Sequence, residues 1–187
     1  SDVYKRQGFA SIEGAVQVPP EGPLVLDGGS SFNWRGEQVT LQVPGLHNSA
    51  NAAVALEAAF AASDDVQGLV SGIEDFRGTS RRFEFKGQTE SGARVFDDYA
   101  HHPTEVAATI AAAQTMGASR VVAAFQPHLF SRTEELASDF AEALALADVA
   151  LVADIYPARE SQEDFPGVTA ESIASLHPEA LKAIGGL

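Results

Sequence analysis

From about residue 80 onward, the sequence repeats one pattern: a short apolar run, a polar loop and a helix-forming segment. Each repeat spans about 30 residues, which is the length that a βαβ unit needs. This alternation predicts an α/β fold with a mostly parallel sheet flanked by helices. We expect strands at residues 82–86, 94–98, 120–125 and 149–154, and helices at residues 104–116, 133–147 and 170–176.

Polar side chains gather directly after three of the expected strands. The clusters are D-D-Y-A-H-H-P at residues 97–103, F-Q-P-H-L-F-S-R-T at 125–133 and D-I-Y-P-A-R-E at 154–160. Ligands of open α/β folds bind outside the carboxyl ends of the strands, so we predict an active site in these loops. Ser131 and Glu134 are three positions apart and predict a capping box at the start of the helix after the second cluster.

The N-terminal part has a different composition. The first seven residues, S-D-V-Y-K-R-Q, show no period, and we interpret residues 1–7 as a remnant that is not native to the protein. Residues 8–44 have the apolar alternation and the Pro and Gly turns of a β meander. Eight of the fifteen residues at 48–62 are alanine, and this segment predicts a helix packed on both sides, followed by a helix at 66–76.

A short polar link at residues 77–80 predicts a domain boundary, which divides the chain into residues 8–79 and 80–187. Near the other end, the chain stops after Gly185 and Gly186 without a further expected strand. We therefore interpret the last repeat as truncated.

The net charge limits the expected partners. The chain has 26 acidic and 12 basic side chains and a formal net charge of -14, so we expect no nucleic acid and no membrane as partners. The absence of cysteine excludes a disulfide scaffold, a thiolate nucleophile and a cysteine-ligated zinc site. No apolar run reaches the ~20 residues of a membrane span, and the N-terminus lacks the pattern of a secretory signal. We expect a cytoplasmic protein.

Five motifs, in their order and spacing, resemble the Mur ligases of peptidoglycan synthesis. They are G-L-H-N-S-A-N from Gly45, R-R-F-E from Arg81, D-D-Y-A-H-H-P-T-E from Asp97, F-Q-P-H-L-F-S-R-T from Phe125 and D-I-Y-P-A-R-E from Asp154. The resemblance implies a Rossmann-like C-terminal Mur ligase domain, preceded by the end of the central ATP-binding domain of that family.

The resemblance also implies an ATP-dependent amide ligation. The family phosphorylates the carboxylate of a nucleotide sugar to an acyl phosphate, which the amine of an amino acid then attacks. The motifs are most similar to those of members that use UDP-N-acetylmuramate and L-alanine, so the implied partners are these two substrates and ATP, with Mg²⁺ as the cofactor ion.

A phosphate-binding G-x-x-G-K-[ST] loop does not occur in the sequence, and the family's Mg²⁺ ligands are expected upstream. We therefore assign no metal ligand here and expect the chain alone to be an inactive part of a longer ligase.

The resemblance assigns five residues to the nucleotide. Asn48 and Asn51 match contacts of the adenine, and His47 lies beside them. Arg82 matches a contact of the phosphates, and Asp98 matches an acceptor for the ribose hydroxyls. From the residues alone, Asn48 suits a helix cap equally well, and a salt bridge between Arg82 and Asp98 would satisfy both.

The resemblance places Tyr99, His101, His128, Arg132 and Arg159 around the amino-acid site. Arg132 lies in the first turn of a helix, whose N-terminus favours anions, and it suits the alanine carboxylate. His101 is the candidate catalytic residue, holding or deprotonating the ammonium group, because its reference pKa of ~6.5 suits proton exchange near neutrality.

Structural roles compete with these assignments in two places. His102 suits the cap of the helix that begins at Pro103. Arg159 and Glu160 are neighbours that have the alternative of pairing with each other.

Two other functions fit parts of the sequence. Asp97, Asp98, His101, His102 and His128 have side chains that suit a metal-dependent hydrolase. Consecutive aspartates at a strand end point to opposite faces, however, so at most one joins the histidines. The other function is a non-catalytic module that binds a nucleotide or an amino acid, which predicts a native start near residue 8 and no phosphate-binding loop.

Overall fold

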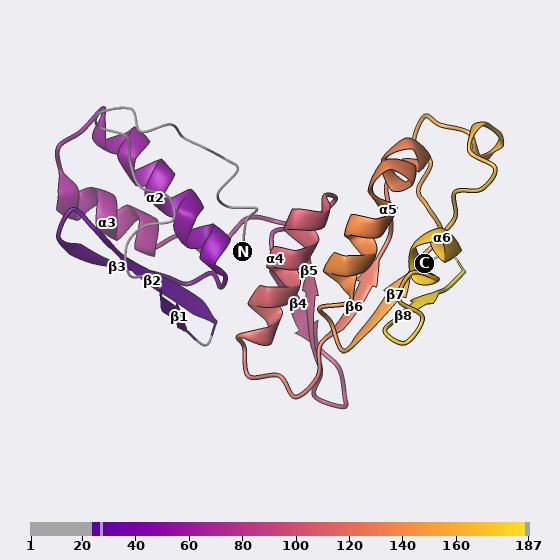
Figure 1. Ribbon diagram of the computed structural model, residues 1–187. Helices are drawn as coiled ribbons and strands as arrows, with labels where there is room; N and C mark the ends of the chain where they lie inside the picture. The colour runs from indigo at the N-terminus through magenta and orange to yellow at the C-terminus, as the bar shows by residue number, and fades with distance from the viewer. Residues whose placement is uncertain (1–23, 27, 186–187) are drawn as a thin grey trace. The chain divides into compact units, whose positions relative to one another are not determined.

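The computed structural model describes residues 24–26 and 28–185 (Figure 1). The chain divides into two compact units, Ser1–Asp98 and Tyr99–Leu187, each with a hydrophobic core of its own. The remnant at residues 1–7 and the β-like pattern up to residue 23 lie outside the described residues. The domain boundary expected after residue 79 remains a prediction.

A three-stranded antiparallel meander forms a sheet in the first unit. Its strands are β1 (Leu24–Leu26), β2 (Gly29–Trp34) and β3 (Glu37–Leu41), in the order β1-β2-β3. Arg35 and Gly36 connect β2 to β3 with φ angles of 49° and 87°, as a tight two-residue hairpin turn requires. The meander expected from the apolar alternation is confirmed for these strands.

Two helices, α2 (Leu46–Phe60) and α3 (Val66–Glu74), pack against this sheet (Figure 1). The expectation that the alanine-rich helix packs on both sides is wrong, because Val54 of α2 is 51% exposed. The buried face consists of residues three or four positions apart. These residues are Ser49, Ala52, Ala53 and Leu56.

Buried hydroxyl groups attach α2 to the sheet. Ser49 Oγ on α2 donates to Ser30 Oγ on β2 at 3.0 Å, and Ser30 Oγ donates to the carbonyl of Val43 at 3.4 Å. Both serines are fully buried. Because a buried hydroxyl without a partner costs stability, these bonds fix the start of α2, which carries His47 and Asn51.

The first unit also contains an antiparallel hairpin of β4 (Glu84–Gln88) and β5 (Arg94–Asp97). Only residues 89–93 connect the two strands, which is too short for the crossover that a parallel pair needs. Phe83 stacks on Phe96 with ring centroids 4.6 Å apart. The strands expected at residues 82–86 and 94–98 therefore pair with each other as an antiparallel hairpin, without a helix between them.

The second unit has a parallel sheet in the order β6-β7-β8. Its strands are β6 (Val122–Phe125), β7 (Val149–Val152) and β8 (Leu181–Ala183). The expected α/β class with a mostly parallel sheet is confirmed. β8 corrects the expectation that no strand follows the last helix, because its three residues, L-K-A, lack the apolar run of β6 and β7.

Helices α4 (Pro103–Gln114), α5 (Phe130–Leu144) and α6 (Ala170–Ala174) flank this sheet, and α4 and α5 lie side by side (Figure 1). Phe125 of β6 packs on Phe140 of α5 with ring centroids 5.0 Å apart, in the main core of the unit. Among the described residues, no helix has both the length and the apolar character needed to cross a membrane.

We expect Gly29→Ala to lower the free energy of unfolding by about 1–3 kcal/mol, since a Cβ there would lie 2.5 Å from the Leu41 carbonyl oxygen and push β2 and β3 apart. Gly72→Ala in α3 is the matched control. Nothing lies within 4 Å of its Cβ position, and alanine is favoured over glycine in a helix by about 1 kcal/mol.

Urea unfolding followed by the fluorescence of Trp34, the one tryptophan of the chain, measures both variants. Destabilisation of the same size by both substitutions would contradict the prediction.

Candidate functional site

The loops after β6 and β7 lie together in the second unit. His128 and Tyr156 form a parallel bridge that continues the pairing of the two strands. The Leu129 N–H donates to the carbonyl of Tyr156 at 2.9 Å, and the Tyr156 N–H donates to the carbonyl of Pro127 at 2.8 Å. The rings of His128 and Tyr156 stack with centroids 5.5 Å apart. Two of the three polar clusters therefore meet at the carboxyl ends of parallel strands, as the sequence predicted.

The start of α5 differs from the sequence-based expectation. Leu129, with a φ of 73°, is the N-cap residue and makes no side-chain cap, so the capping box expected for Ser131 and Glu134 is wrong. Ser131 lies inside the first turn, where its hydroxyl donates to Glu160 Oε1 and its N–H donates to Glu160 Oε2 at 3.0 Å.

Glu160 thus bonds to the start of α5, and this contact was missed by sequence analysis, which considered Arg159 as its partner. The hydrogen bonds from the Ser131 hydroxyl and N–H hold the pKa of Glu160 below its usual value, and Arg159 adds a smaller electrostatic contribution. The D-I-Y-P-A-R-E motif marked Glu160 as a residue of interest, but the sequence held no signal for the partner, which is 29 positions away.

The two arginines assigned to the amino acid differ in their surroundings. Arg132 directly follows Ser131 in the first turn of α5 and is half-buried. Within residues 28–185, no hydrogen bond or ion pair engages its guanidinium group. Arg159 is exposed, in the loop after β7. Arg132 is therefore a half-buried cation near a sheet edge, as a carboxylate ligand would need.

The loop from Tyr99 to His102 precedes α4. His101 Nδ1 lies 3.0 Å from the Tyr99 carbonyl oxygen and 3.3 Å from Glu105 Oε2, and both of these oxygens are acceptors. Two acceptors beside Nδ1 favour the tautomer that carries its proton on Nδ1, which leaves Nε2 as the nitrogen with a free lone pair. Glu105 also accepts from the His101 N–H at 3.0 Å and thereby folds this loop.

His102 caps α4, as the sequence predicted. It is the N-cap residue, and its Nδ1 accepts from the Thr104 N–H at 3.3 Å. This leaves His101 and His128 as the two histidines of the second unit's loops that retain their candidate roles in the amino-acid site.

In the first unit, the fold brings together three of the residues assigned to the nucleotide. His47, near the start of α2, is half-buried. Burial lowers its pKa, while Asp98 raises the pKa and Arg82 lowers it further. The charges of Arg82 and Asp98 therefore both act on the His47 ring, although these residues are far apart in the sequence. With a lowered pKa, His47 is neutral at pH 7.

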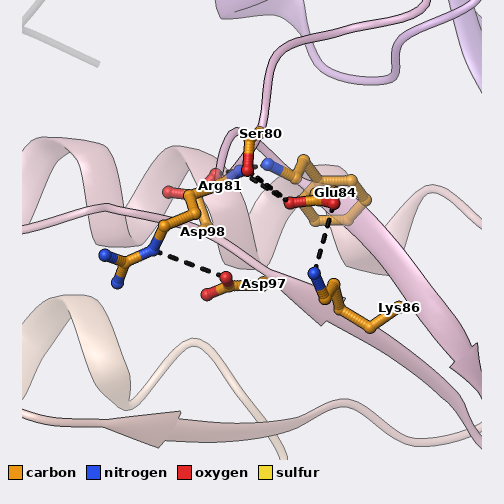
Figure 2. A network of polar contacts seen from close by, with 7 residues as sticks. Ser80, Arg81, Glu84, Lys86, Asp97 and Asp98 are labelled. Carbon is orange, nitrogen blue, oxygen red and sulfur yellow. Dashed lines mark hydrogen bonds and ion pairs between the residues drawn. The ribbon is translucent and has the colours of Figure 1, made fainter.

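The two consecutive aspartates at the end of β5, Asp97 and Asp98, have different contacts (Figure 2). Asp97 Oδ2 lies 3.4 Å from Arg81 Nε, and Asp98 Oδ2 accepts from the Phe83 N–H at 2.8 Å. The expectation that the two carboxylates point to opposite faces agrees with this separation. An ion pair thus joins Arg81 to Asp97, the residues that directly precede Arg82 and Asp98.

Glu84 organises the backbone that precedes this hairpin (Figure 2). Its Oε2 accepts from the Arg81 N–H at 2.9 Å and from Ser80 Oγ at 3.1 Å, and its Oε1 accepts from Lys86 Nζ at 3.2 Å. The hydrogen bond from the Arg81 N–H is the largest of the contacts that lower the pKa of Glu84. The segment that carries Arg82 is therefore held on both sides.

The two asparagines of α2 are placed differently. Gly45 is the N-cap residue of the helix, so the alternative that Asn48 is the cap is wrong. Asn48 lies within the first turn, and its Nδ2 donates to the carbonyl of Pro44 at 2.7 Å. Asn51 is exposed one turn later. Of the two amides, the side chain of Asn51 is the more accessible to a ligand.

No group of three or more His, Asp or Glu side chains in the described part of the chain is arranged to hold a metal ion. The donor set that would support a metal-dependent hydrolase, with Asp97, Asp98, His101, His102 and His128, is thus not assembled by these residues. Asp97, Asp98 and His102 instead have the structural contacts given above.

The lowered pKa of His47 predicts a pH dependence of stability. The unfolded chain binds a proton near pH 6.5 and the folded chain only at lower pH, so the free energy of unfolding should fall as the pH drops below about 6.5. We expect His47→Gln to flatten this part of the profile in urea titrations followed by Trp34 fluorescence. An unchanged slope between pH 7 and pH 5 would show that His47 does not titrate in this way.

Comparisons with known proteins identify the family. Residues 81–183, more than half of the chain, match the family model described as Mur ligase, glutamate ligase domain. The UDP-N-acetylmuramate--L-alanine ligase of Renibacterium salmoninarum is 50% identical over 151 residues, which are 77% of this chain and 32% of that protein. The ligase of the same name from Arthrobacter sp. (strain FB24) is 55% identical over 134 residues, 71% of this chain and 28% of that protein. The chain spans about a third of the length of these relatives.

Solved structures share the fold. A UDP-N-acetylmuramate-alanine ligase from Thermotoga maritima matches with a TM-score of 0.68 and 26% identity, covering 88% of this chain and 36% of that chain. A folylpolyglutamate synthase from Mycobacterium tuberculosis matches with a TM-score of 0.62 and 16% identity, covering 88% and 37%, and at this identity the likeness concerns the fold alone. Since the family model covers more than half of the chain, this protein belongs to the Mur ligase family.

Proposed function

We propose that the protein containing this chain joins L-alanine to UDP-N-acetylmuramate in peptidoglycan synthesis, using ATP. The two relatives that are 50% and 55% identical are named for this ligation. The observation that carries the proposal is the pairing of the loops after β6 and β7, which in a member of this family sets His128 and Arg132 at the carboxyl ends of parallel strands.

The proposed reaction has two steps. A carboxylate oxygen of UDP-N-acetylmuramate attacks the γ-phosphorus of ATP, so that ADP leaves and an acyl phosphate forms. The amine nitrogen of L-alanine then attacks the acyl carbon, the bond to the phosphate oxygen breaks, and inorganic phosphate leaves. Because L-alanine arrives as an ammonium ion, a base must take a proton before its nitrogen can attack.

We assign the proton transfer to His101 and the binding of the amino acid to Tyr99, His128, Arg132 and Arg159. The contacts of Nδ1 with two acceptors leave His101 Nε2 as the base. Arg132 suits the alanine carboxylate, because a guanidinium group binds a carboxylate with two hydrogen bonds. Tyr99, His128 and Arg159 complete the proposed site as substrate-binding residues.

The first unit holds the proposed contacts of the nucleotide. A neutral, half-buried His47 and the exposed amide of Asn51 suit a purine, and Asn48 retains its side-chain oxygen as an acceptor. Arg82 suits the phosphates and Asp98 suits the ribose hydroxyls. The donors and acceptors of these five residues therefore fit a nucleotide.

Mg²⁺ accompanies ATP in the proposed reaction, where it would neutralise phosphate charge. The residues described here do not fit an ion site, because none of their acidic or histidine side chains form a suitable group. We therefore place the Mg²⁺ ligands and the phosphate-binding loop upstream, and residues 8–79 at the end of an ATP-binding domain. ATP and a UDP-linked sugar are cytoplasmic metabolites, which supports a cytoplasmic location.

Reading the source DNA upstream of the codon for Gly8 tests this proposal first. We expect an open frame with a G-x-x-G-K-[ST] sequence between a strand and a helix, and phosphate release by the complete product when UDP-N-acetylmuramate, L-alanine and ATP are all present. A start codon near Gly8 without such a loop would favour the non-catalytic binding module and overturn the ligase.

In the complete protein, we expect Arg132→Ala to raise KM for L-alanine by about 100-fold with little change in KM for ATP, since one charge-assisted carboxylate contact is lost. Steady-state phosphate release measures both constants. Arg120→Ala is the control, because Arg120 is exposed before β6 and outside the site. Equal KM values for L-alanine in the two variants would remove Arg132 from the amino-acid site.

A further inference from the structure

α5 begins without a cap from its own sequence neighbours. Its N-cap residue is Leu129, which cannot accept a hydrogen bond through its side chain. The φ of 73° places this leucine in a region that favours glycine, so the surrounding contacts must hold it there. The first N–H groups of a helix need acceptors, and the N-cap residue of α5 supplies none through its side chain.

Glu160 supplies this cap from a distant loop. Its two carboxylate oxygens accept from the N–H and from the hydroxyl of Ser131, the second residue of α5. A carboxylate at this end of a helix is favoured by the positive end of the helix dipole. Glu160 therefore already supplies the negative charge that the start of α5 attracts. The carboxylate of a bound amino acid would then need Arg132 as its partner.

The contacts on either side of Ser131 lead to the same segment of chain. Leu129 bonds to the backbone of Tyr156, and the ring of Phe130 stacks on Phe165 with centroids 5.9 Å apart. Phe130 is also buried in a small core with Ile155 and Val168. Hydrophobic packing thus brings the first turn of α5 close to the loop after β7, while the hydrogen bonds of Glu160 fix its rotation.

We infer that Glu160 is a positioning residue for the amino-acid site: by capping α5 through Ser131, it sets the direction of Arg132 and the place of His128 beside Tyr156. This inference rests on the proposed function. Arg132 follows Ser131 directly, so a rotation of the first turn moves its guanidinium group. Because the partner of Glu160 is Ser131, its effect on the amino acid is indirect.

The test compares five variants of the complete ligase. We expect Glu160→Gln to raise KM for L-alanine by about tenfold, because an uncharged acceptor holds the helix start less firmly and a small displacement of a binding group is costly. KM for ATP and for UDP-N-acetylmuramate should stay within about twofold of the wild type, since these substrates do not use Arg132. Glu160→Asp, which keeps the charge, should restore part of the loss.

Ser131→Ala tests the partner, because it removes the hydroxyl contact and keeps the N–H contact. We expect a smaller rise in KM for L-alanine than in Glu160→Gln. The double variant Ser131→Ala/Glu160→Gln should have the same KM for L-alanine as Glu160→Gln alone, because the two residues act through one shared contact. Glu163→Gln is the matched control, since this exposed glutamate lies in the same loop, in the short 3-10 helix Gln162–Asp164, and should leave all constants unchanged.

Hydrogen exchange of the Ser131 amide provides a readout besides activity. We expect faster exchange in Glu160→Gln and unchanged exchange in Glu163→Gln. Equal KM values for L-alanine in Glu160→Gln and Glu163→Gln, with an active wild type, would overturn the positioning role alone. A wild type without alanine-dependent phosphate release would overturn the proposed function and the role of Glu160 together. A parallel loss of affinity for all three substrates would show a general structural defect and also refute the inference.

Discussion

The parallel pairing of β6 with β7 is the constraint on which the candidate amino-acid site depends. Two residues in register across parallel strands keep their neighbours in register beyond the strand ends, and here the pairing continues to His128 and Tyr156. Because of this continuation, the side chains of two loops that are about 28 positions apart face the same edge. A shift of one residue in the register would turn the alternate side chains to the other face of the sheet.

The charged residues of the second unit have different roles: Glu160 caps a helix, and Arg132 is the proposed ligand of the substrate carboxylate. The chain is strongly acidic, with a net charge of -14, so a carboxylate substrate must be attracted locally. Glu160 satisfies the start of α5, and Arg132 next to it keeps its guanidinium group without an ion pair within residues 28–185. Because Glu160 already occupies the start of α5, recognition of the substrate carboxylate depends on the guanidinium group of Arg132.

The nucleotide residues of the first unit depend on burial in a similar way. Ser30 and Ser49 fix the start of α2 through a hydrogen bond that is fully buried from solvent. His47 lies two residues before Ser49. Burial keeps His47 neutral, while Arg82 and Asp98 act on it with opposite signs. A neutral ring can both donate and accept a hydrogen bond, which a charged ring cannot.

The sequence by itself determined the α/β class, the strands β6 and β7, the polar loops after them and the family, because apolar runs, turn residues and motif order are local properties of the chain. Only the tertiary structure decided that Glu160 rather than Glu134 serves Ser131, that Asn48 bonds back to Pro44, and that α2 buries one face. These outcomes depend on which distant groups come within hydrogen-bond or packing distance in the folded chain. The local sequence around an alanine-rich helix or a single carboxylate does not indicate which group that will be.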